Sequence, residues 1–357
     1  MAPMVARATI YEVARRSGVS TATVSRVMQE GTGFSAATRD RVLASATDLG
    51  WVPSGPARGL ASRRSGIVGV LFPDLGGSGD PEAESPLFVD EVIRGAERAA
   101  TAVGDAVLIA ATRGSSGRDL AYSVAGKVDG LVVMARSLAE HDVEAISRSV
   151  PLVVFANHTT RPKHDIVGAD NRGGTRQLVE HLIAVHGYTD IAYVGGPARS
   201  PDSVERFAGF RGAMGAAGLA VPRAPAADGG FTEHGGARAM RTLLGAGAPP
   251  RAIVFGNDEM AIGALGVLHE ARLRVPSNVA VTGFDDIASA RHVRPALTTV
   301  YQPMRDLGER AVQVLFDRLR DPDARTRSIV LPTQTVIRRS CGCRMRSAVI
   351  RRRNPQS

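Results

Sequence analysis

The sequence lacks the residues and patterns on which several classes of protein depend. Only two of its 357 residues are cysteine, Cys341 and Cys343, which excludes a framework of disulfide bonds. Only two are lysine, Lys127 and Lys163, and neither stands in a GxxxxGK[ST] motif, which excludes a P-loop. The GxSxG pattern of serine hydrolases and the HExxH pattern of zinc proteases are also missing. These absences argue against three common classes of enzyme.

Long apolar segments are missing as well. No run of 18 apolar residues occurs, so no membrane-spanning helix is predicted. The first ten residues, MAPMVARATI, contain neither the apolar core nor the cleavage site of a secretory signal peptide. We therefore expect a cytoplasmic protein.

Charge is distributed unevenly along the chain. The total is +9, but residues 1–65 hold nine arginines against four acids, and residues 338–357 hold seven arginines and no acid. The residues between them therefore carry a net charge of −3. Basic ends on a near-neutral body indicate a polyanionic partner at the ends. The basic tail is expected to be disordered, and it is either merely solvated or adds a non-specific contact to DNA.

Capping residues delimit three short helices in the first fifty residues. Thr9 and Glu12 have the spacing of a capping box, and Gly18 ends the helix that follows. The only tryptophan, Trp51, is expected in the core of this small unit. The second and third helices are expected over residues 21–28 and 36–49, capped by Ser20 and Ser35.

The first two helices have the arrangement of a helix-turn-helix, in which the second helix enters the major groove of DNA. When Val24, Val27 and Met28 face inward, the opposite face presents short or hydrogen-bonding side chains together with Arg26. A guanidinium can chelate a guanine edge. The periodicity alone fits an ordinary three-helix bundle with a polar outer face equally well.

From residue 66 onward, short apolar runs alternate with helical periods. Repeated β-then-α units predict parallel sheets covered by helices on both faces, with ligands at the carboxyl ends of the strands. A stretch of about 270 residues is long for one open sheet, so two lobes are expected. Strands are expected over 66–72, 106–110, 130–134, 151–156, 190–196, 252–255 and 278–283, and helices include 88–102, 173–186, 204–217 and 259–271.

Several segments resemble, in the same order, landmarks of the LacI/GalR family of bacterial transcription regulators. The most specific is VSTATVSRV, and GNDEMAIGAL and VTGFDDIASARHVRPALTTVYQP follow it. The resemblance extends over about residues 8–340. It implies an all-α helix-turn-helix headpiece (1–53), a hinge helix and linker (54–65), an α/β two-lobed periplasmic-binding-protein-like (type I) effector and dimerisation domain (66–340), and a basic tail (341–357).

The family implies a sequence-specific transcription regulator, most often a repressor, and not an enzyme. A homodimer would bind double-stranded, pseudo-palindromic operator DNA in the nucleoid, and a small-molecule effector would control its affinity. A solute-binding protein with the same effector fold would instead need a signal peptide and no headpiece. An enzyme would need a nucleophile–base set or a cofactor fingerprint, and the sequence offers neither.

The resemblance also assigns roles in DNA binding. Thr21 and Ala22 would read base edges together with Arg26. A leucine at the position of Leu60, in a hinge helix that folds on DNA, would wedge into the minor groove. The alternative for the hinge is a passive tether. The remaining contacts, mostly to phosphates, would come from Tyr11, Ser20, Thr23, Ser25 and Ala57.

Five residues match positions that contact the effector in relatives. Arg206, Asn257 and Asp285 together offer donors and acceptors that suit vicinal hydroxyl groups, which indicates a sugar or sugar derivative. Phe88 and Phe231 would supply apolar walls. Two alternatives remain open: Arg206 and Asp285 can form a purely structural ion pair, and both phenylalanines can be plain core.

No cofactor and no metal are expected. The spacing of His158, His164, His181 and His186 matches no zinc pattern, and a separation of five residues places the last two on different helix faces. The two cysteines have no histidine near them in the sequence and are expected to be free thiols. Two features are less well defined: the loop containing Asp202, whose side-chain direction is open, and an insertion at 75–85.

Overall fold

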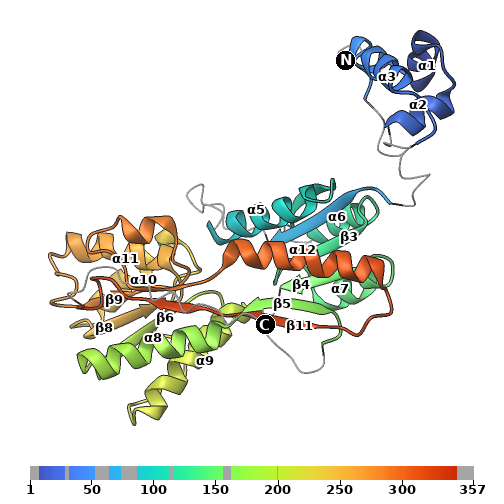
Figure 1. The fold of residues 1–357 in the computed structure, drawn as a ribbon. Coiled ribbons are helices and arrows are strands. Elements are labelled where there is room, and N and C mark those ends of the chain that lie inside the picture. The colour runs from blue at the N-terminus through green and yellow to red at the C-terminus, as the bar shows by residue number, and fades with distance from the viewer. Residues whose placement is uncertain are drawn as a thin grey trace, which may run out of the picture. The chain divides into compact units, whose positions relative to one another are not determined.

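The chain forms two compact units, Met1–Gly66 and Ile67–Ser357, in a computed structural model (Figure 1). The structure describes residues 8–28, 32–52, 64–73, 87–112, 116–155, 162–198 and 200–343. Residues 54–63 of the predicted hinge and linker, the insertion at 75–85 and the tail from 344 onward lie outside these residues. Among the described helices, none is both long enough and apolar enough to cross a membrane.

The first unit, the headpiece, is the three-helix unit that the capping residues predicted. Its helices are α1 (Ile10–Ser17), α2 (Thr21–Met28) and α3 (Ala36–Asp48). The capping box is formed in both directions, since the Thr9 side chain accepts from the backbone N–H of Glu12 and the Glu12 carboxylate accepts from that of Thr9. Gly18 ends α1 in the left-handed conformation. The helices close over a core of Val13, Val24, Val27 and Val42, against which Trp51 packs.

The second unit, the two-lobed unit, contains two separate parallel sheets, as predicted. The first lobe has a six-stranded sheet in the order β11-β5-β4-β3-β1-β2. Its strands are β1 (Ile67–Pro73), β2 (Ala106–Thr112), β3 (Gly130–Val133), β4 (Leu152–Phe155), β5 (Asp165–Ala169) and β11 (Ser328–Leu331). The helices of this lobe are α5 (Leu87–Thr101), α6 (Ser116–Ala125), α7 (Glu140–Ser147) and α12 (Met304–Arg320).

Alternation of side chains along the strands explains why helices cover both faces of this sheet. One face, with Val68, Val70 and Val132, packs against α5 and α12. The opposite face, with Leu71 and Leu131, packs against α6 and α7. Where α5 and α12 cross, a Cβ on Gly308 would lie 1.9 Å from the Val92 carbonyl oxygen, so only glycine permits this approach.

The second lobe has a four-stranded sheet in the order β7-β6-β8-β9. The helices α8 and α9 pack on one face of it and α10 and α11 on the other. An antiparallel ribbon of β10 and β12 completes the fold. The elements are β6 (Ile191–Gly195), β7 (Ala227–Asp228), β8 (Ala252–Phe255), β9 (Ala280–Thr282), β10 (Thr299–Tyr301), β12 (Gln334–Val336), α8 (Asn171–His186), α9 (Pro201–Ala216), α10 (Glu233–Gly245), α11 (Asp258–Glu270) and the short 3-10 helix η1 (Ala288–Arg291).

The chain passes between the lobes after β5, after β10 and again after β11 (Figure 1). Each predicted strand is present within two residues of its predicted ends. The sequence did not predict β5 or β11. The first residue of β5, Asp165, is buried and ion-paired with Arg318, whose Nε lies 2.9 Å from the carboxylate, so a charge interrupts the apolar pattern.

Candidate functional sites

A cavity of about 90 Å³ lies between the two lobes of the two-lobed unit. It opens at the carboxyl ends of the strands: Pro73 ends β1, Phe155 ends β4, and Asn257 follows β8. This is where the parallel sheets were expected to bind a ligand. The wall is mostly apolar; most of its charged and amide groups lie on the second-lobe side, and Arg136 comes from the first lobe. Residues of the wall include Phe88, Val89, Met134, Arg136, Asp202, Arg206, Phe231, Asn257, Asp285, Gln302 and Leu307.

All five predicted effector residues line this cavity. Phe88 comes from α5 in the first lobe, and Arg206 comes from α9 in the second. Phe231 precedes α10, Asn257 precedes α11, and Asp285 follows β9. Residues from five separate stretches of the second unit, both lobes included, thus meet at one place, which the sequence could indicate only through resemblance.

Arg206 is the centre of the polar cluster. It is buried, with 4% of its surface exposed. Its Nε donates to the Asn171 side chain at 2.8 Å, and its Nη1 donates to the Gly256 carbonyl at 2.6 Å. Its Nη2 donates to the Gln302 side chain at 2.7 Å. The guanidinium carbon lies 3.7 Å from the centre of the Phe284 ring, so an aromatic face supports it as well.

Asp285 is the counter-ion of Arg206. Its Oδ1 lies 3.2 Å from Arg206 Nη2, but the hydrogen bond of that nitrogen goes to Gln302. The second N–H of this nitrogen makes no hydrogen bond of normal geometry to Asp285 Oδ1, which is a buried oxygen without such a donor among the described residues. Burial, opposed by the attraction of Arg206 and assisted by the nearby charge of Asp202, raises the pKa of Asp285 to about 6. A ligand hydroxyl could supply the missing donor.

The geometry bears on both alternatives left open by the sequence. The ion pair between Arg206 and Asp285 does form, and it forms in the wall of the cavity, so the structural ion pair and the predicted effector contacts occupy the same place. Both phenylalanines also pack partly against the hydrophobic core. Phe231 has a backbone φ of +66°, and its ring centre lies 5.6 Å from the Arg206 guanidinium carbon.

The side chain of Asn257 makes hydrogen bonds within the protein at both ends of its amide. Its Oδ1 accepts from the backbone N–H of Met260 and so caps α11. Its Nδ2 donates to the Phe231 carbonyl at 3.0 Å. Asn257 was expected to offer a donor and an acceptor to the effector. Both its amide nitrogen and its oxygen already make hydrogen bonds within the protein, which join α11 to the segment before α10.

The polar cluster contains three further residues. Asn171 and Gln302 were not predicted, and the side-chain direction of Asp202 was left open. Asn171 and Gln302 each accept a hydrogen bond from Arg206, and the Asn171 amide donates to the Asp202 carboxylate at 2.9 Å. Asp202 lines the cavity, which settles its direction. Asn171 begins α8 and Gln302 follows β10, far apart in the sequence, so no local pattern could have grouped them.

The headpiece presents the predicted reading face on α2. Ala22 and Arg26 are exposed, and Thr21 is half-buried. Val24 and Val27 point into the core, and Tyr11 on α1 is 74% exposed. The remaining predicted contacts comprise Ser20 and Thr23, whose hydroxyls lie 3.0 Å apart, the half-buried Ser25, and Ala57 and Leu60, which lie outside the described residues.

The two cysteines are free thiols, as expected, but the sequence did not predict their surroundings. The sequence placed no histidine near Cys341 or Cys343, but the fold brings His181 and His186 of α8 against both of them. The argument from helix faces fails because His186 is the last residue of α8, and its ring lies 5.2 Å from that of His181, centre to centre.

Comparison with known proteins gives consistent results over nearly the whole chain. Residues 9–54 match the model for bacterial regulatory proteins of the lacI family, and residues 179–341 match a periplasmic binding protein-like domain. The Ribose operon repressor of Escherichia coli K12 is 34% identical over 88% of this chain and 94% of its own length. Catabolite control protein A of Priestia megaterium is 32% identical over 93% and 98%, respectively.

Solved structures are similar across both units. A Lac repressor dimer bound to operator and the anti-inducer ONPF has a TM-score of 0.79 at 27% identity, covering 94% of this chain and 99% of that one. A complex of the transcriptional regulator CelR with cellobiose has a TM-score of 0.69 at 31% identity, covering 94% and 100%.

Proposed function

Because the chain belongs to the lacI family of bacterial regulatory proteins, we propose that it represses transcription from a pseudo-palindromic operator and that a sugar or sugar derivative controls its affinity for that DNA. The family makes it a DNA-binding transcription regulator and not an enzyme. Such a regulator acts in the cytoplasm, and we place it on nucleoid DNA.

The observation that carries the effector part of the proposal is the polar cluster in the cavity between the lobes. A buried guanidinium, a carboxylate oxygen without a donor and an amide converge on one side, and mostly apolar side chains, together with Arg136, line the other. A sugar has hydroxyls that both donate and accept, together with an apolar ring face, so it complements both sides. Relatives named for ribose and complexed with cellobiose support the same ligand class.

The reading part rests on the exposed face of α2. Arg26 can chelate a guanine edge, and Ala22 can touch a thymine methyl group but cannot donate a hydrogen bond. Thr21 is assigned to the bases beside them. The phosphate contacts assigned to Tyr11, Ser20, Thr23 and Ser25, and the hinge contacts of Ala57 and Leu60, belong to the same proposal.

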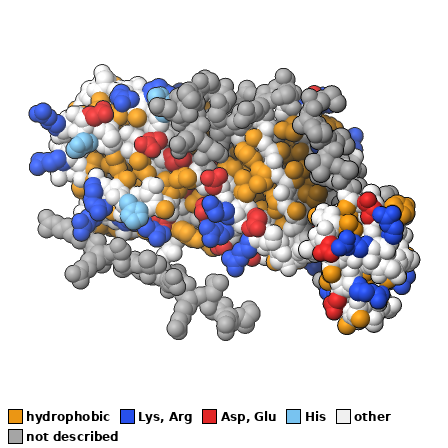
Figure 2. Space-filling view, turned by 90° about the horizontal axis from the view of Figure 1, so that it is seen from above, with side chains coloured by type: hydrophobic (Ala, Val, Ile, Leu, Met, Phe, Trp, Pro, Cys, Tyr) orange, Lys and Arg blue, Asp and Glu red, His pale blue; other side chains and the backbone are white. Residues whose placement is uncertain are grey.

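We assign the protein a homodimeric state. The similar Lac repressor structure is a dimer on operator DNA, and a twofold-symmetric site requires two headpieces. Figure 2 shows hydrophobic side chains gathered on one face, with basic and acidic side chains beside them. Three exposed apolar side chains also lie on or next to the edge strand β2: Val103, Ile109 and Tyr122. A second copy could cover such positions.

The DNA part is tested with the full-length protein. Selection from random duplexes should yield a twofold-symmetric site, and log affinity should fall linearly with log salt concentration. Arg26→Ala should weaken specific binding by about 1–3 kcal/mol and relax one position in each half-site. The matched control is Arg41→Ala, which removes an exposed arginine from α3. Unchanged operator affinity in Arg26→Ala would refute the docking.

The effector part is tested separately, with a panel of pentoses, hexoses and disaccharides. A sugar that binds the folded protein raises its melting temperature and changes its operator affinity. Asp285→Asn should remove both responses and leave operator binding intact. A panel that changes neither quantity would refute the sugar proposal without affecting the DNA part.

A further inference from the structure

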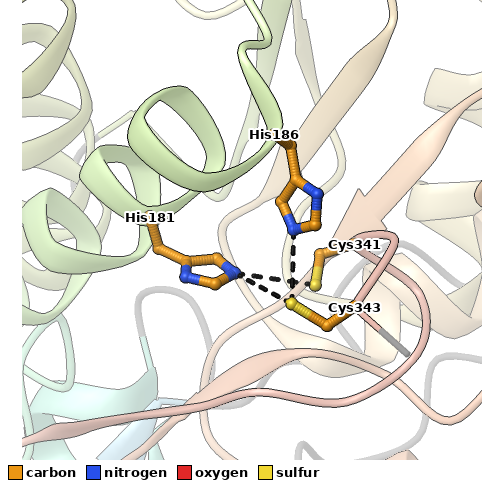
Figure 3. Close-up of side chains that lie close together, drawn as sticks. All are labelled: His181, His186, Cys341 and Cys343. Atoms are coloured by element: carbon orange, nitrogen blue, oxygen red, sulfur yellow. Dashed lines mark hydrogen bonds between the residues drawn. The ribbon is translucent and has the colours of Figure 1, made fainter. Parts of the chain in front are cut away.

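The side chains of His181, His186, Cys341 and Cys343 form a compact group in the second lobe (Figure 3). The histidines come from the last turns of α8, and the cysteines flank Gly342 in the segment after β12. One nitrogen or sulfur atom from each residue lies within 4.8 Å of all the others. Both histidines direct Nε2 towards the sulfur atoms (Figure 3).

The separations match the edges of a tetrahedron around a small ion. With zinc–sulfur bonds of about 2.3 Å and zinc–nitrogen bonds of about 2.0–2.1 Å, a tetrahedral site needs sulfur–nitrogen separations of about 3.6 Å. Cys343 Sγ lies 3.5 Å from His181 Nε2 and 3.3 Å from His186 Nε2. Cys341 Sγ lies 3.8 Å from His181 Nε2. Small shifts would bring all four atoms to bonding distance of one ion.

The backbone between the two cysteines allows His186 to lie close to them. Gly342 has a φ of +111°, a conformation that favours glycine. A Cβ at this position would also lie 3.2 Å from the His186 ring and 3.2 Å from the Tyr188 hydroxyl oxygen. Glycine between the two cysteines therefore lets the segment turn and lets His186 come close to it.

Hydrogen bonds of the two residues before Gly342 hold the segment in place. The Tyr188 hydroxyl donates to the Cys341 carbonyl at 3.1 Å. Next to it, the Ser340 hydroxyl donates to the Val281 carbonyl at 2.6 Å, and its oxygen accepts from the Thr298 backbone N–H. Cys341 itself is fully buried and packs in the hydrophobic core of the lobe. The donor atoms are thus positioned by contacts that involve no metal.

We propose that His181, His186, Cys341 and Cys343 bind one Zn²⁺ ion. Two thiolates and two imidazoles in a tetrahedral arrangement are the donor set that selects zinc among common divalent ions. Two thiolates also neutralise the charge of the ion in a partly buried place. All four positions of the tetrahedron are protein ligands, so the ion has no open position for a substrate and serves structure.

The ion would fasten the segment after β12 to the end of α8. Without it, hydrogen bonds and the packing of Cys341 provide the attachment. With it, four additional bonds would connect residues about 155 apart in the sequence. The five arginines of residues 344–357 begin directly after Cys343, so the site would also fix the point from which this basic segment starts.

The test uses full-length protein purified without chelators. Elemental analysis should find about one zinc ion per chain. Replacing zinc with Co²⁺ should give the strong visible bands of tetrahedral cobalt and the near-ultraviolet bands of cobalt–thiolate bonds. Cys343→Ser and His186→Gln should each weaken zinc binding by more than about 100-fold, whereas His269→Gln, an exposed histidine on α11, should bind as the wild type does.

The wild-type protein alone can decide the question if a variant fails to fold. Zinc should raise the melting temperature of metal-stripped wild type and protect its two thiols from a thiol reagent until a chelator is added. Absence of zinc from protein grown with zinc, together with a cobalt spectrum lacking the tetrahedral bands, would overturn the proposal. An intact mass showing the two cysteines joined as a disulfide would overturn it too.

Discussion

Asp285→Asn should change how the stability of the two-lobed unit depends on pH. Burial raises the pKa of Asp285 from 3.8 to about 6 in the folded protein. In the unfolded chain the carboxyl group loses its proton near its ordinary pKa of about 3.9. Between these values the folded state binds more protons than the unfolded state. The contribution of Asp285 to stability is therefore greatest at low pH and falls as pH rises towards 6.

The size of the effect follows from the shift. A difference of about two pKa units corresponds to about 3 kcal/mol, of which about 2 kcal/mol falls between about pH 4.5 and 7. Asparagine does not ionise, so the free energy of unfolding of the variant minus that of wild type should rise by about 2 kcal/mol over this range. The pKa of Asp258 is raised by burial and, secondly, by the charge of Asp285, so the variant also lowers the pKa of Asp258, and this adds to the difference in the same direction.

The measurement is urea unfolding at a series of pH values, followed by far-ultraviolet circular dichroism. Tryptophan fluorescence is unsuitable because the only tryptophan, Trp51, lies in the headpiece. Gln302→Leu is the control, since it alters the same cluster without removing a titratable group. A difference between Asp285→Asn and wild type that is flat or falls with rising pH would refute the assignment of the raised pKa.

Two further predictions concern the fold itself. Gly308→Ala should destabilise the two-lobed unit by roughly 1–3 kcal/mol, because its methyl group would meet the Val92 carbonyl between α12 and α5. Gly266→Ala, on an exposed turn of α11 with no neighbouring atom within 4 Å, should instead stabilise it by about 0.4–1 kcal/mol, and equal effects in urea unfolding would contradict the packing argument. Thr9→Ala should destabilise the headpiece by about 1 kcal/mol in thermal unfolding followed by Trp51 fluorescence, because the capping box at α1 is lost. No change in the headpiece melting temperature would show that the cap contributes nothing.

Sequence patterns predicted the helices and strands that are determined by neighbouring residues, such as capping residues and apolar runs. The caps at Thr9, Ser20 and Ser35 located the headpiece helices, and α3 ends one residue before the predicted end because Leu49 serves as its cap. Apolar runs located the buried strands. The strand β5 was missed because its first residue, Asp165, is stabilised by an arginine that follows it by 153 residues.

The candidate sites also contain some residues that the sequence predicted and others that only the tertiary fold brings together. Resemblance placed Arg206 and Asp285 at the cavity, but Gln302 and Asn171 join them only through the tertiary fold. The group at Cys341 was missed for a related reason. Spacing rules treat His181 and His186 as residues about 140° apart on a continuous helix, whereas α8 ends at His186. Only the fold brings the two cysteines beside them.

The position of β11 has a consequence for biosynthesis. This strand, Ser328–Leu331, completes the sheet that β1 begins at residue 67, and it pairs in parallel with β5. A ribosome must therefore make almost the whole polypeptide before the first lobe can be finished, and until then β5 presents an unpaired backbone edge. Pairings so distant in the chain also form slowly. A chain truncated before residue 328 would consequently have two incomplete lobes. The first lobe would lack β11, and the second would lack β12 and Cys341.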